Sequence, residues 1–214
     1  MKYFLLSAVL GFTLLPAFGQ REHTFSFASD SAPSDWTFKG FNGNQFSSDI
    51  LVDFHVDLNE IGAGGKVTLQ SRHYLEAVTA DYQQIPCGNN YLHIWKVRGA
   101  IYVEHYNAPG NPGIIQINFD EAVLTALSPT SSRIVDSMTL QVNAESDPTV
   151  QFQALNVLLG LGIGPAGTDQ GENLAYTITD IRNPGGGSFV PIDPVSGKFL
   201  DSWYAEGSFS ASSY

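Results

Sequence analysis

The chain is poor in cysteine, the residue whose disulfide bonds cross-link many small domains. Cys87 is the only cysteine among 214 residues, so no disulfide can form within the chain and the fold must depend on its hydrophobic core. A disulfide bond between the Cys87 residues of two chains remains an alternative. The chain is long enough for such a core, since a domain of about this size buries roughly 70% of the surface of its unfolded chain.

Charged residues are also scarce, and most of them are acidic. They make up 14% of the chain, and 21 acids against 10 Lys and Arg residues leave a formal net charge of −11. This acidic protein repels nucleic acid and anionic lipid at long range, so neither is an expected partner. No block of like charge marks a disordered tail.

Long apolar runs are missing as well, since a helix needs about 20 such residues to cross a bilayer. The internal run at 157–163 is short and rich in glycine. The N-terminal run has the three parts of a cleavable signal peptide: Lys2, an apolar stretch at 4–15, and small side chains at Ala17 and Gly19. We therefore expect a secretory signal peptide at 1–19, no transmembrane segment after its cleavage, and a secreted, periplasmic or extracellular location.

The chain lacks the short motifs that identify common enzyme classes. It contains no Gly-x-Ser-x-Gly elbow, phosphate-binding loop, dinucleotide-binding glycine fingerprint or His-Glu-x-x-His sequence. We therefore expect no cofactor, and a function in binding rather than in catalysis.

Short segments of alternating apolar and polar residues dominate the rest of the chain. Val52, Phe54 and Val56, for example, share one face of residues 51–58. Such segments, rich in β-branched and aromatic residues and separated by turn-forming residues, are typical of antiparallel strands. They predict one all-β domain over residues 20–214, a jelly-roll-like β-sandwich with one short helix at 121–128. Strands are expected at 23–28, 36–41, 51–58, 66–75, 91–97, 100–106, 114–119, 134–142, 150–155, 174–181, 188–192 and 198–209.

The segment 91–106 is the most informative one, because it is rich in aromatic residues and too long for an ordinary strand. Arg98-Gly99 offers a two-residue hairpin turn, since glycine adopts positive φ easily. Counting outward from that turn places His93 opposite Glu104 and puts both on a face with four rings. These are the predicted ligand-binding residues, Tyr91, Trp95, Tyr102 and Tyr106.

Three functions for this face stay open. Flat rings beside hydrogen-bonding groups suit a carbohydrate-binding platform for a glycan or a cell-envelope or matrix component, and this is the function we expect. A His–Glu pair could also transfer protons, which would make the protein a glycan-cleaving enzyme that uses Glu104 and His93. Alternatively the rings pack between the sheets of a purely structural surface protein.

Two oxygen-rich clusters are candidates for metal sites. Asp53, His55 and Asp57 share one face of a predicted strand, but successive ligands about 6.5–7 Å apart cannot converge on one ion without help from a neighbouring strand. Residues 168–173 could hold calcium but lack the aspartate spacing of a calcium loop. We therefore predict no metal site.

Overall fold

The computed structural model describes residues 23–28, 38–57, 66–143, 150–161, 168–169 and 171–213. These residues form an all-β protein, as predicted, and the expected signal peptide at 1–19 lies outside them. The elements are β1 (His23–Ala28), β2 (Phe38–Gly40), β3 (Gln45–Asp57), β4 (Lys66–Cys87), β5 (Asn90–His105), β6 (Gly113–Ser128), β7 (Arg133–Val135), β8 (Ser137–Asn143), β9 (Gln151–Ala154), α1 (Asn156–Gly160), β10 (Thr168–Asp169), β11 (Gly171–Arg182), β12 (Phe189–Pro191) and β13 (Trp203–Ser213).

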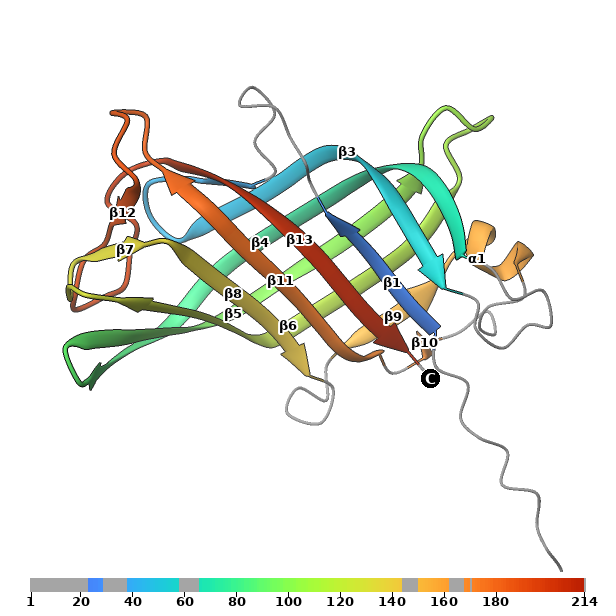
Figure 1. Ribbon diagram of the computed structural model, residues 1–214. Coiled ribbons are helices and arrows are strands. Elements are labelled where there is room, and N and C mark those ends of the chain that lie inside the picture. Colours follow the sequence, from blue (N-terminus) through green and yellow to red (C-terminus); the bar gives the residue numbers. More distant parts are fainter. Residues whose placement is uncertain are drawn as a thin grey trace, which may run out of the picture.

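Eight strands close into an antiparallel barrel (Figure 1). Around the ring the order is β1, β3, β4, β5, β6, β8, β11 and β13, and β13 pairs again with β1. Chain neighbours within this set are therefore neighbours in space, as in an up-and-down barrel. The expected sandwich of two separate sheets is not what this pairing describes, because β6 pairs with β8 and joins the two ends of the sheet.

The predicted hairpin at Arg98-Gly99 is wrong, because β5 runs through this point as one strand. Gly99 pairs with Ala77 on one side and Phe119 on the other, beside a bulge in the pairing with β6. A Cβ atom on Gly99 would lie 2.3 Å from the Glu76 carbonyl oxygen. Glycine is therefore needed at this position because two backbones approach each other closely beside a bulge and leave no room for a side chain.

The helix predicted at 121–128 is also wrong, because these residues form the second half of β6. Ala122, Leu124 and Ala126 are buried, and the residues between them lie on the outer face. Pairing with β5 and β8 supplies the backbone hydrogen bonds that a helix would have formed internally. Among the described residues the only helix is the single-turn α1, which follows β9. No helix in this part of the chain is long and apolar enough to cross a membrane.

The middle of the barrel is filled by aromatic side chains. The Phe54 ring lies 6.2 Å from the rings of both Phe25 and Phe209, and Tyr176 lies 5.0 Å from Phe209, measured between centroids. All four side chains are almost fully buried. An eight-stranded barrel has an interior that side chains can just fill, and these rings occupy it.

One end of the barrel is covered by the segment that follows β12, on the side where β7 and β12 lie in Figure 1. Phe199 and Gly43 exchange two backbone hydrogen bonds, and the Trp95 indole N–H donates to the Gly197 carbonyl oxygen at 2.9 Å. Gly197 has a φ of +67°, and a Cβ atom there would lie 2.3 Å from the Tyr82 ring. This end is therefore closed by contacts that only glycine permits.

We expect the substitution Gly197→Ala to lower the free energy of unfolding by about 2–5 kcal/mol, because it adds left-handed backbone strain to a clash with the Tyr82 ring. Gly186→Ala is the matched control, since Gly186 has a φ of +82° and open space around its Cα. Only the strain remains there, so the loss should be about 1–2 kcal/mol. Urea denaturation measures both values, and equal losses would contradict the proposed packing.

Candidate functional site

The four predicted ligand-binding rings do not share a face. Because β5 is continuous, residues of odd number point into the barrel and those of even number point outward, from His93 to Val103. Trp95 is 1% exposed inside the barrel, whereas Tyr102 lies on the outer face. Tyr91 lies opposite buried Ser128 at the start of β5, and Tyr106 follows its end. The single platform expected from the hairpin register therefore does not exist.

His93 and Glu104 are not brought together either. Eleven residues separate them along β5, which corresponds to about 36 Å. His93 is fully buried, with its Nδ1 atom 2.8 Å from the Tyr82 hydroxyl and its Nε2 atom 3.3 Å from the Thr130 carbonyl oxygen. Burial lowers the pKa of His93. Its ring thus closes the barrel end, while Glu104 lies on the outer face.

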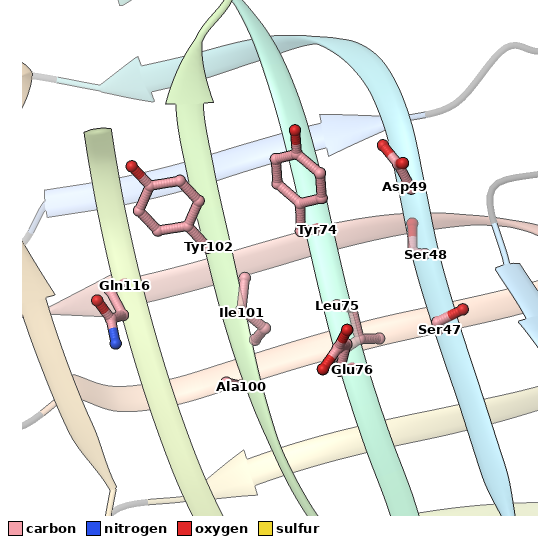
Figure 2. A pocket seen from close by; sticks show the side chains of 10 residues that line it. All are labelled: Ser47, Ser48, Asp49, Tyr74, Leu75, Glu76, Ala100, Ile101, Tyr102 and Gln116. Atoms are coloured by element: carbon pink, nitrogen blue, oxygen red, sulfur yellow. The ribbon is translucent and has the colours of Figure 1, made fainter. Parts of the chain in front are cut away.

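A groove on the outer face of the barrel is the best candidate for a site (Figure 2). Its volume is about 670 Å³, and it crosses β3, β4, β5 and β6. Figure 2 shows the two tyrosines side by side, with the β3 residues on one flank and Gln116 of β6 on the other. The lining residues are Ser47, Ser48, Asp49, Tyr74, Leu75, Glu76, Ala100, Ile101, Tyr102 and Gln116.

Two tyrosine rings form one wall of the groove. Tyr74 and Tyr102 are directly opposite each other in the β4–β5 pairing, and their centroids are 6.2 Å apart at an interplanar angle of 36°. A Cβ atom on Gly113 would lie 2.9 Å from the Tyr102 hydroxyl oxygen. The Tyr102 side chain thus lies between Tyr74 and the start of β6, where it lines the groove.

Charged groups hold the Tyr74 ring in place. The Arg72 guanidinium donates two hydrogen bonds to Asp49, of 2.8 and 2.9 Å, and lies 4.9 Å from the Tyr74 ring centroid. These bonds lower the pKa of the Asp49 carboxyl. The Tyr74 hydroxyl donates to Glu104 at 3.2 Å, and burial together with this bond raises the pKa of Tyr74. The ring is therefore fixed on one side by a cation and at its tip by a carboxylate.

A buried polar chain lies behind the groove floor. Ser48 lines the groove with its backbone and points its side chain inward, where its Oγ atom is 3.3 Å from His73 Nδ1. The His73 Nε2 atom is 2.6 Å from the Tyr176 hydroxyl on the far wall of the barrel. Burial lowers the pKa of His73 to about 3 and raises that of Tyr176 well above its usual value. This chain ties the groove strands β3 and β4 to β11.

Of the four predicted ligand-binding rings, Tyr102 lines this groove, and the sequence analysis did not single out Tyr74, Arg72 or Asp49. The register of the β3–β4 and β4–β5 pairs places these side chains beside each other, and a correct prediction of that register would have identified them. Asp53 and His55, two of the candidate metal ligands, are exposed on β3, where His55 Nδ1 lies 3.0 Å from the Thr68 hydroxyl. No group of three metal-ligating side chains occurs within the described ranges.

Comparison with known proteins identifies no relative: no family model, curated protein or solved structure matches this chain. The groove therefore has to be interpreted from its own geometry.

We expect the protein to lose stability in acid because of His73. Its folded pKa of about 3 lies below the unfolded value of about 6.5, so the unfolded chain binds the extra proton between these values. Stability from this group is complete above pH 6.5 and falls as the pH drops toward 3. Between pH 7 and pH 4 the loss should be about 3 kcal/mol.

Urea denaturation of a His73→Gln variant tests this assignment. Glutamine cannot take up the proton, so the difference in stability between pH 7 and pH 4 should shrink by about that amount. His55→Gln is the control, since it removes an exposed imidazole and should keep the pH dependence of the unaltered protein. The same pH dependence in the His73 variant would show that another group causes the acid lability.

Proposed function

We propose that this protein is an exported, non-catalytic binding domain that holds a neutral glycan of a cell envelope or matrix in its outer groove. The observation that carries the proposal is the Tyr74–Tyr102 pair, two preoriented rings that open onto a groove with polar flanks. The volume of about 670 Å³ falls in the range of small-ligand sites, about 300–1,000 Å³.

Aromatic rings suit sugars because both surfaces are flat. The axial C–H bonds of a sugar ring carry small positive charge, and they are attracted to the negative face of a tyrosine ring. Since Tyr74 and Tyr102 are already held by neighbouring groups, little side-chain entropy is lost when a ligand binds. The rings therefore supply contact area at low cost.

The flanks of the groove supply hydrogen bonds to sugar hydroxyls. Glu76 and Gln116 lie on either side of the floor, and Ser47 adds a hydroxyl from β3. Carboxylates accept from hydroxyl groups, and an amide both donates and accepts. The net charge of −11 disfavours polyanionic glycans at long range, so a neutral chain fits the groove best.

The geometry favours binding over cleavage. A glycosidase needs two carboxyl groups that face one bond. Asp49 is occupied by Arg72 and Glu104 by the Tyr74 hydroxyl, which leaves Glu76 as a single groove carboxylate for such a pair. Both acids serve to hold the Tyr74 ring in place. His93, the other residue of the predicted catalytic pair, is buried at the barrel end.

We expect Tyr102→Ala to weaken oligosaccharide binding about tenfold, or by about 1.4 kcal/mol, because it removes half of the aromatic wall. A glycan array identifies the tightest oligosaccharide, and titration calorimetry then measures the affinity. Tyr91→Ala is the matched control, because it removes the same side chain outside the groove. Circular dichroism establishes that both variants fold.

Two results would contradict the proposal. One is the absence of any glycan ligand for the unaltered protein. The other is an equal loss of affinity in the Tyr91 and Tyr102 variants, which would place the binding site elsewhere on the barrel.

A further inference from the structure

A cluster of amide side chains adjoins the groove on its β6 side. Gln116 and Asn118 point outward from β6, because the residues on either side of each are buried in the barrel. On β9, Gln153 pairs directly with Gln116, and Gln151 pairs directly with Asn118. Both glutamines of β9 are exposed. We call Gln116, Asn118, Gln151 and Gln153 the amide cluster.

The amide cluster continues the rows of residues that cross the groove. Gln116 is directly opposite Tyr102 in the β5–β6 pairing, and Asn118 is directly opposite Ala100. Figure 2 shows Gln116 at the flank of the groove, on the side of Tyr102. Neighbouring strands lie about 4.8 Å apart, so β9 is only about 10 Å from β5. A ligand that lies on the tyrosine rings can therefore reach the cluster with its next unit.

The four amide groups are open to a ligand. Within the part of the chain that the structure describes, none of them makes a side-chain hydrogen bond to another residue. The opposite flank of the groove differs, because Asp49 already accepts two hydrogen bonds from Arg72. An amide has two N–H donors and an oxygen with two lone pairs, so each side chain of the cluster can both donate to and accept from a bound molecule.

An acetamido substituent of a sugar matches this combination of groups. It is itself a planar amide, so its N–H can donate to a side-chain oxygen while its carbonyl oxygen accepts from a side-chain N–H. A sugar hydroxyl has only one hydrogen to donate. The acetamido methyl group needs an apolar contact, and Ala100 and the Tyr102 ring lie next to the β6 amides. The cluster and its apolar neighbours thus fit an acetamido sugar better than a sugar with hydroxyl groups alone.

We propose that the amide cluster is a subsite for the acetamido groups of a neutral N-acetylated glycan. This inference rests on the proposed function, because the same glycan must lie on Tyr74 and Tyr102 in the groove. A peptide also carries amide groups, but it has no sugar ring to lie flat on the two tyrosines. A short oligosaccharide can contact the rings and the cluster at once, because β6 is the only strand between β5 and β9.

Titration calorimetry with two matched trisaccharides tests the subsite. Chitotriose and cellotriose have the same β-1,4-linked backbone and differ only in the acetamido group that replaces one hydroxyl of each unit. We expect chitotriose to bind about tenfold more tightly, as one or two additional hydrogen bonds would give. Both trisaccharides should lose affinity in Tyr102→Ala, because both lie on the rings.

The variant Gln153→Ala removes one amide of the cluster. We expect the ratio of the chitotriose affinity to the cellotriose affinity to fall at least about threefold, because hydrogen bonds to the acetamido group are lost. Gln70→Ala is the matched control: Gln70 is an exposed glutamine of β4 outside the cluster, so this variant should keep the ratio of the unaltered protein. A purely structural effect would weaken the binding of both trisaccharides together and leave their ratio unchanged.

Four results would overturn the subsite. Equal affinities for the two trisaccharides, or an unchanged ratio in the Gln153 variant, would do so and leave the proposed glycan groove intact. Failure of chitotriose to bind, while a glycan array finds another ligand that needs Tyr102, would have the same meaning. Tighter binding of the blocked peptide acetyl-trialanine-amide than of chitotriose would assign the cluster to a peptide. The absence of any glycan ligand, by contrast, would overturn the proposed function together with the subsite.

Discussion

The pairing of β6 with β8 is the constraint on which the other features depend. Three residue pairs, from Val123–Gln141 to Thr125–Thr139, join the two halves of the sheet into a ring. Once the ring is closed, each strand has one face in the core and one outside, and a side chain cannot change faces without a shift of register. This is why Trp95 and Tyr102, on the same strand, have entirely different environments.

The closed ring also supports the groove on both sides. Its wall, the Tyr74–Tyr102 pair, belongs to β4 and β5, which pair with partners on both sides along most of their length. Behind its floor, the chain from Ser48 through His73 to Tyr176 joins β3 and β4 to the opposite wall. Such buried polar networks specify one arrangement when every member has a partner. The groove is thus built on strands and held from inside.

The sequence by itself determined the all-β class and the approximate position of most strands, because a two-residue period of apolar side chains is a local property. The prediction was wrong at Gly99, because glycine is typical of both a turn and a bulge. It was also wrong at 121–128, where pairing with β5 and β8 outweighed helix propensity. Tyr102 was predicted as a ligand-binding residue, but the residues that lie beside it in the groove were not.

Only the tertiary structure decided which residues meet. Arg72 lies beside Asp49 and Tyr74 beside Tyr102 because of strand register, and register depends on contacts between residues far apart in the chain. Because the prediction placed a hairpin turn at Arg98-Gly99, it assigned Trp95 to a ligand-binding face, whereas Trp95 is buried in the core. Strand positions are determined locally, but faces, and with them the site, are determined by how the barrel closes.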